Sequence, residues 1–156
     1  MITEQHILQS SRIFLRIALG ATFLVACADR FGILGQYGSR NVSWGDWKHF
    51  EQYAGVLVWF LPKAAIPTLA IVETVIEVAL GMALLAGTWT RLIAWASAGL
   101  LASFAATMSI ALGIIAPISY GVFTAIGAAL LLGAVAPRAA IRRRSELPSV
   151  GSNLSA

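Results

Sequence analysis

Long apolar runs separated by short polar stretches set the pattern of this chain. The apolar segments lie near residues 12–35, 64–87, 89–115 and 117–136. A helix of about 20 apolar residues, rising about 1.5 Å per residue, crosses the hydrocarbon layer of a bilayer. The pattern therefore predicts four membrane-spanning helices. The short polar turn Gly87–Arg91 predicts that the second and third spans form a hairpin.

Residues 36–63, between the first two apolar segments, are too polar at their start to span a membrane. Their aromatic side chains Trp44, Trp47, Phe50 and Tyr53 recur at helical spacing. Such a stripe predicts an amphipathic helix lying at the outer membrane interface, where aromatic rings prefer to sit. On the outer surface these four residues would suit lipid headgroups or a partner protein, so they are the predicted interface residues.

Composition supports the membrane interpretation. Hydrophobic residues make up 58% of the chain and charged residues only 12%, against roughly 25% charged in soluble domains. The mean hydropathy is +0.80. We therefore expect an all-α, integral membrane four-helix bundle as one domain over residues 1–137, with the interfacial helix between its first two spans. The single cysteine, Cys27, excludes a disulfide within the chain and a CxxC redox pair.

The basic residues predict the orientation. Four spans place both termini on the same side as the turn at residues 88–90. That side holds seven of the eleven Lys and Arg residues, namely Arg12, Arg16, Arg91, Arg138 and Arg142–Arg144. The positive-inside rule then predicts a multi-pass protein of the bacterial inner membrane with both termini cytoplasmic, ending in a basic and then polar tail over residues 138–156. Basic residues at span ends, rather than on one polar face, do not indicate nucleic-acid binding.

Two carboxylates interrupt the second span. Glu77 lies near its middle, and Glu73 lies one turn away on the same helix face. An ionisable group at this depth costs about 2.5–3.5 kcal/mol, so both should face the bundle interior. Two interpretations stay open: a catalytic pair that handles protons or binds a ligand, or structural carboxylates that bond a neighbouring helix or an arginine.

Arg30 and Asp29, near the outer end of the first span, are the candidate partners. An arginine side chain can bridge the difference in depth to Glu73, which predicts a polar ligand-binding cluster of Arg30, Asp29, Glu73 and Glu77. The alternative is that the Arg30 side chain only extends to lipid headgroups. For Arg16, near the other end of this span, extension to headgroups is the favoured interpretation.

The histidines predict no metal site, because His6 and His49 lie on opposite sides in this topology. No pattern for haem, flavin or an iron–sulfur cluster is present. Small residues repeat every fourth position in the last two spans, as Ala94, Ala98, Ala102 and Ala106 and as Gly121, Ala125, Ala129 and Gly133. Such rows let helix backbones approach closely in lipid.

Two stretches resemble the DoxX/DoxD-like family of small bacterial membrane proteins. One runs from Arg16-Ile-Ala-Leu-Gly20 to Ala28-Asp29-Arg30-Phe31, and the other from Glu77-Val-Ala-Leu-Gly81 to Gly87-Thr-Trp-Thr-Arg91. The resemblance covers roughly residues 12–132, and the long aromatic insert is closer to the DoxD-like branch. It implies a four-helix membrane bundle associated with redox systems. In that branch it implies a subunit of thiosulfate:quinone oxidoreductase, although fold transfers between relatives better than function.

The leading functional hypothesis is a membrane subunit of a quinone-linked redox system. In it, the bundle holds the quinone tail, and Glu73, Glu77 and Arg30 lie near the head group. A quinone is then the one cofactor expected, and a redox partner subunit supplies any other. The alternative is a non-catalytic anchor that docks a redox enzyme through the aromatic outside loop. Whether the chain is itself an enzyme, and whether it forms a homo-oligomer, stays open.

Overall fold

The computed structural model describes residues 4–137, which form helices joined by loops and turns and contain no strand. The helices are α1 (Glu4–Arg30), α2 (Trp47–Leu57), α3 (Ile66–Ala86), α4 (Thr90–Leu112), α5 (Ile115–Ser119) and α6 (Val122–Val135), and a short 3-10 turn, Lys63–Ala65, leads into α3. By length and composition, α1, α3 and α4 could each cross a membrane. The all-α prediction is confirmed. The predicted tail at residues 138–156 lies outside the described residues.

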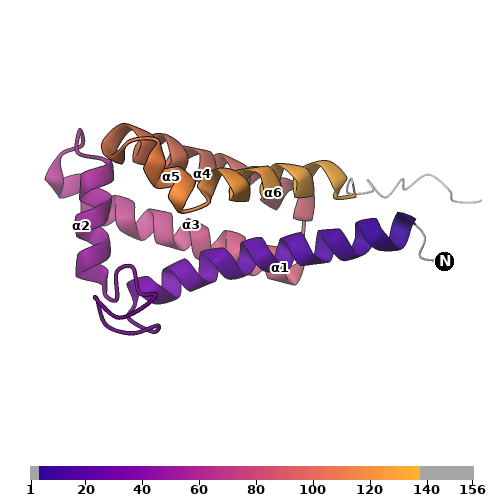
Figure 1. The fold of residues 1–156 in the computed structure, drawn as a ribbon, viewed down its shortest axis with the longest axis horizontal. Coiled ribbons are helices and arrows are strands. Elements are labelled where there is room, and N and C mark those ends of the chain that lie inside the picture. The colour runs from indigo at the N-terminus through magenta and orange to yellow at the C-terminus, as the bar shows by residue number, and fades with distance from the viewer. Residues whose placement is uncertain (1–3, 138–156) are drawn as a thin grey trace, which may run out of the picture.

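The four longer helices α1, α3, α4 and α6 run roughly along the long axis of the molecule (Figure 1). The start of α1, the turn between α3 and α4 and the end of α6 lie together at one end, which we call the termini end. Helices α2 and α5 lie at the opposite end, the α2 end. The long helices therefore alternate in direction, and α3 and α4 form the predicted hairpin.

The predicted bounds of two helices need correction. Helix α1 begins at Glu4 instead of near residue 12, so the polar start of the chain is helical. It ends at Arg30, before residue 35, because Gly32 takes a left-handed φ of 72° and the Ile33 N–H donates to the Ala28 carbonyl. The last apolar segment is likewise broken. Gly121, with a φ of 68°, separates α5 from α6, which leaves α6 with only 14 residues.

Helices α1 and α3 pack through two glycines. A Cβ added to Gly20 would lie 3.0 Å from the Gly81 carbonyl oxygen, and one added to Gly81 would lie 3.1 Å from the Gly20 oxygen. Any larger residue at either position would push the two backbones apart. Both glycines belong to the motifs that carry the family resemblance.

Arg16, on the termini-end half of α1, bonds the end of α3. Its Nε donates to the Leu84 carbonyl at 2.9 Å, and its Nη2 donates to the Leu85 carbonyl at 3.0 Å. The prediction that Arg16 only extends to headgroups is therefore wrong. The side chain satisfies carbonyls that the last turn of a helix leaves without partners.

Helices α4 and α6 form the other close pair, built on small residues. Ala94 and Ala98 on α4 are buried, as are Ala129 and Gly133 on α6. The predicted row on α4 is only half correct, since Ala102 and Ala106 are exposed. The buried row turns instead through Leu101 and Ala105, because a spacing of four drifts around a helix of 3.6 residues per turn.

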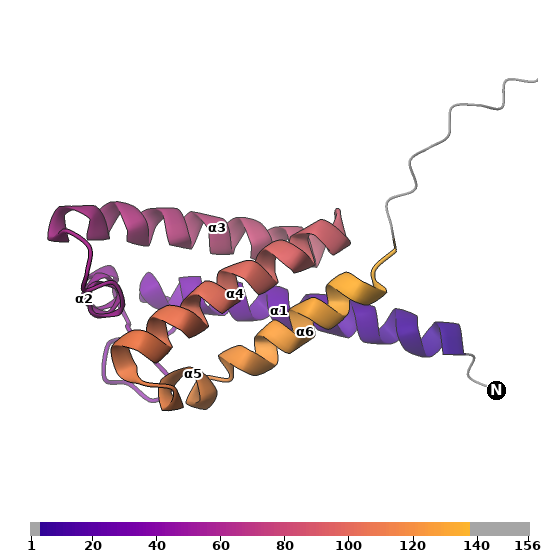
Figure 2. The same cartoon turned by 90° about the horizontal axis from the view of Figure 1, so that it is seen from above.

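The α1–α3 pair and the α4–α6 pair separate toward the α2 end. Figure 2 shows α3 and α4 meeting at their turn and diverging from there, with α2 at the open end. The candidate site lies in this half of the molecule.

Candidate functional site

Arg30, in the last turn of α1, is the centre of the site and is 2% exposed. Its Nη1 lies 2.5 Å from Glu77 Oε2 and donates to Thr74 Oγ1 at 2.7 Å, while its Nη2 lies 3.3 Å from Glu73 Oε1. We call Arg30, Glu73, Thr74 and Glu77 the Arg30 cluster. The predicted Arg30–Glu73 pair is present. The alternative, in which Arg30 extends to headgroups, is wrong.

Helix α3 supplies the other three members because their spacing places them on one face. The Thr74 hydroxyl donates to the Ala70 carbonyl at 2.8 Å, which leaves its oxygen free to accept from Arg30. Glu77 is almost fully buried, with a side-chain exposure of 3%, whereas that of Glu73 is 21%. Two carboxylates thus share one guanidinium, so a proton or a second cation is needed to make the cluster neutral.

Aromatic rings from the connecting segment cover Arg30. The guanidinium carbon lies 3.9 Å from the centroid of the Phe50 ring and 5.4 Å from that of Trp44. Both distances suit cation–π attraction, which is strongest where water is excluded. The positive charge of Arg30 is thus held by carboxylates on one side and ring faces on another.

The prediction that the aromatic stripe faces outward is therefore wrong. Phe50 is 2% exposed, and Trp44, Trp47 and Tyr53 are partly buried. Trp47 stacks on Phe31, with centroids 5.8 Å apart, and Trp44 meets Phe50 edge to face. Helical spacing identified the apolar face of α2 correctly, but this face is directed at the neighbouring helices.

Asp29 was predicted to belong to the cluster around Arg30, but its carboxylate binds elsewhere. Its Oδ2 accepts the backbone N–H groups of Ser43 at 2.8 Å and Trp44 at 3.1 Å, and its Oδ1 accepts that of Gly45 at 3.2 Å. Gly45 has a left-handed φ of 68° and no room for a Cβ beside the backbone of Tyr37. Asp29 therefore fixes the loop that places Trp44 against Arg30.

A cavity of about 710 Å³ adjoins the cluster and is bounded by α1, α2, α3 and α4. Arg30, Glu73, Glu77 and Tyr53 supply polar groups, and Phe104 and Met108 of α4 belong to its apolar wall. The contribution of α4 was not predicted, because apolar residues on an apolar helix give no signal in the sequence. The cavity is amphipathic, with charge at one end and hydrocarbon over most of its wall.

Tyr53 contributes a hydroxyl that stays protonated. Burial raises its pKa to about 12, with smaller contributions from Tyr120 and Glu73. The phenol is thus neutral at physiological pH and can donate a hydrogen bond into the cavity. Cys27, the single cysteine, is buried with its Sγ 3.6 Å from Glu77 Oε2.

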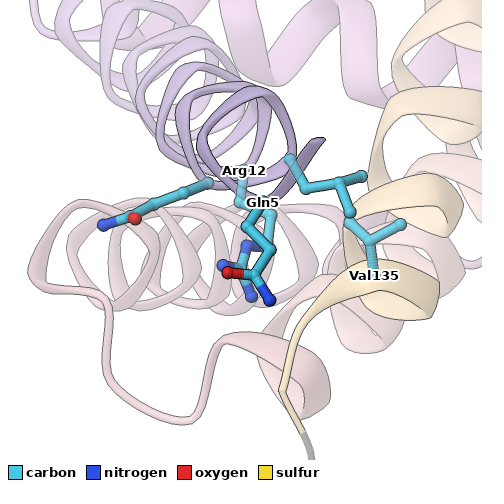
Figure 3. Close-up of a pocket in the computed structure, with 5 residues that line it drawn as sticks. Gln5, Arg12 and Val135 are labelled. Carbon is cyan, nitrogen blue, oxygen red and sulfur yellow. The ribbon is translucent and has the colours of Figure 1, made fainter. Parts of the chain in front are cut away.

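The remaining polar groups lie apart from the cluster. His49 Nδ1 lies 2.8 Å from Asp46 Oδ2, and its ring stacks on Tyr37. Within residues 4–137, no three His, Cys, Asp or Glu side chains gather in a way that could hold a metal ion. A second hollow, at the termini end, is lined by Gln5 and Arg12 of α1 and by Val135 of α6 (Figure 3). It contains no carboxylate.

Neither a family model, nor a characterised protein, nor a solved structure matches this chain. The resemblance to the DoxX/DoxD-like family therefore rests on the two motifs alone. The roles of the site residues follow only from the geometry described above.

Proposed function

We propose that the chain is a multi-pass protein of the bacterial inner membrane in which α1, α3, α4 and α6 form a four-helix bundle. Support comes from the apolar character of three long helices and from the exposed apolar side chains along them, such as Phe14, Val75 and Leu92. Both termini face the cytoplasm, because sequence order assigns seven of the eleven Lys and Arg residues to the side that holds the termini. The α2 end then lies at the outer side.

Within this frame, we propose that the protein is the membrane subunit of a quinone-linked redox system and binds the quinone in the cavity. The observation that carries the proposal is the amphipathic cavity beside the Arg30 cluster. A quinone has two carbonyl oxygens that accept hydrogen bonds and an apolar tail. Tyr53 and Arg30 supply donors for the head, and the apolar wall suits the tail.

The cluster also fits the proton balance of quinone chemistry. Reducing a quinone to a quinol takes two electrons and two protons. A pair of carboxylates sharing one guanidinium can hold one of these protons and release it to a reduced oxygen, and water supplies the second proton to the other oxygen. The electrons come from a redox partner subunit, because the chain carries no pattern for an electron-carrying group. The resemblance to the DoxD-like branch favours thiosulfate:quinone oxidoreductase as the class of complex.

Quenching of tryptophan fluorescence tests this proposal, because Trp44 lines the cavity and quinones quench tryptophan. Purified protein in lipid nanodiscs is titrated with decylubiquinone and, separately, with a menaquinone analogue. We expect saturable quenching by at least one of them. Tyr53→Phe removes one hydrogen bond, worth about 0.5–1.5 kcal/mol, and should weaken binding several-fold. Tyr37→Phe is the matched control outside the cavity, and equal losses in both variants would contradict the proposed head-group position.

Glu77→Gln tests the proton-handling role. This change keeps the hydrogen-bonding shape of the side chain and removes its proton-carrying function. With the intact complex, we expect bound quinone to be retained and turnover to fall. Parent-like turnover of Glu77→Gln would limit Glu77 to a structural role.

The second candidate function is a non-catalytic anchor for a redox enzyme. A specific observation favours it: apolar side chains are exposed at the α2 end, including Phe31, Ile33, Trp59 and Phe60. These residues, rather than the inward stripe, would form the docking surface. Native mass spectrometry of the complex separates the candidates, since it reports a bound quinone, a partner subunit or a homo-oligomer. The anchor would be supported if the parent carried a partner subunit and no quinone, and if the Trp59→Ser/Phe60→Ser double variant lost that partner.

A further inference from the structure

The cavity reaches the side of the molecule between α3 and α4. Val72 and Ile76 of α3 line it and are also exposed on the surface, by 49% and 41%. Ser103 of α4 also lines the cavity and is exposed, and Thr107, one turn further, lines it and is partly buried. Residues that line the cavity and are also exposed mark where it opens, and on the α3–α4 side the rim consists of these residues. These residues belong to the first half of α3 and the second half of α4, the part of the two helices that is nearer to α2 and where they diverge (Figure 2).

The rim is apolar in effect. Val72 and Ile76 follow one another at a spacing of four, as do Ser103 and Thr107, so each pair forms a ridge along its helix. The Ser103 hydroxyl donates to the Leu100 carbonyl at 2.7 Å, and the Thr107 hydroxyl donates to the Ser103 carbonyl at 3.0 Å. Because these donors are satisfied within α4, the rim meets its surroundings mainly through hydrocarbon.

Size requires such an opening for a long-tailed ligand. A cavity of about 710 Å³ lies in the range that encloses a drug-sized molecule of roughly 300–1,000 Å³. It can hold a quinone head and the first part of a tail, but not a long polyprenyl chain. With the head at the Arg30 cluster, the rest of the tail must leave the cavity through an apolar opening.

We infer that the gap between Val72 and Ile76 on α3 and Ser103 and Thr107 on α4 is a lateral portal. Through it, a membrane-dissolved amphiphile enters from the bilayer and leaves its tail in lipid. The inference rests on the proposed quinone function and deepens it, because it limits the substrate to long-tailed molecules delivered by the membrane. Glu73, the more exposed carboxylate of the cluster, follows Val72 directly and lies at the inner side of the portal.

The test is a portal-blocking substitution with a matched control on the same helix. Val72→Trp places a bulky ring in the portal, whereas Val75→Trp adds the same ring at a position that is 62% exposed and does not line the cavity. Each variant in nanodiscs is titrated with decylubiquinone and with its tail-less counterpart. We expect Val72→Trp to raise the dissociation constant of decylubiquinone about tenfold and to leave that of the tail-less compound within about twofold of the parent value. Val75→Trp should change neither dissociation constant.

Ser103→Trp blocks the portal from the α4 side and tests it independently, should Val72→Trp fail to fold. Parent-like decylubiquinone binding by a folded portal variant would overturn the portal and leave the quinone function standing. An equal loss of affinity for both compounds would overturn the portal as well, since the tail would then play no part in binding. If the parent binds neither compound, both the quinone function and the portal are overturned.

Discussion

Arg16 and Arg30 lie on the same helix, yet their side chains bind different kinds of partner. Arg16, toward the termini end, is partly exposed and donates to backbone carbonyls at the end of α3. Arg30, at the α2 end, is buried and faces two carboxylates and an aromatic ring. The comparison teaches that the partner of an arginine, rather than its presence in an apolar helix, decides whether it supports the fold or forms a site.

The difference has an electrostatic origin. The last carbonyls of a helix carry only partial negative charge, so Arg16 supplements an end that Gly87 already caps with a left-handed φ of 73°. The partners of Arg30 are carboxylates, and an ionised carboxylate carries a full charge in surroundings that solvate it poorly. Removing Arg30 should therefore cost far more than removing Arg16.

The largest effect is expected for Arg30→Met, which leaves the buried carboxylate of Glu77 and the partly buried carboxylate of Glu73 without a cation. Breaking a buried pair in this way costs about 3–5 kcal/mol of unfolding free energy. Thermal unfolding in detergent measures the loss, and Arg30→Lys should recover part of it because the charge returns with fewer donors. An Arg30→Met variant as stable as the parent would remove the basis of the comparison.

The next effect concerns the two carboxylates that lie beside Arg30. Glu73→Gln and Glu77→Gln each leave one carboxylate opposite Arg30, so each should cost only about 1–2 kcal/mol. The double variant strands the buried cation and should cost more than the sum of the two. Unfolding curves of the three variants form a double-mutant cycle. Simple additivity would mean that the two carboxylates do not share Arg30.

Arg16→Met should have a smaller effect than the double carboxylate variant. It removes two charge-assisted hydrogen bonds from a partly exposed side chain, for which we expect a loss of about 1–2 kcal/mol. Quinone binding should stay at the parent level, because Arg16 lies in the other half of α1. If Arg16→Met weakened binding as strongly as Arg30→Met, the two arginines would not have separate roles.

The smallest effect concerns pH and Asp46, which caps α2. Its carboxylate accepts from the His49 backbone N–H and lies beside the His49 ring, and these contacts hold the pKa of Asp46 below its ordinary value. Because the pKa is lower in the folded state, the stabilising contribution is fully present above the unfolded value of about 3.9 and is lost as the pH falls through the folded value.

Asp46→Asn keeps an acceptor at the cap and removes the titration. We expect the difference in melting temperature between parent and Asp46→Asn to shrink as the pH falls from neutral to below 4, a range set by the ordinary aspartate pKa of about 3.9. A difference that is constant with pH would show that the carboxylate charge does not stabilise α2.

The Arg30–Glu73 pair could be predicted because few alternatives exist for a charge in an apolar helix. An ionisable residue at that depth needs a partner, and Arg30 is within reach once the two helices run side by side. Asp29 was misassigned for a related reason. Its partners are three backbone N–H groups, which every residue carries and no sequence pattern marks.

The sequence by itself determined the all-α fold, the apolar face of α2 and the presence of charge inside an apolar segment. These features follow from local periodicity and from the cost of burying charge. Only the tertiary structure decided which way that face points, that Glu77 joins Arg30, and that α3 and α4 diverge to leave a cavity. Periodicity says which residues share a face but not which neighbour the face meets, since that depends on how all the helices pack at once.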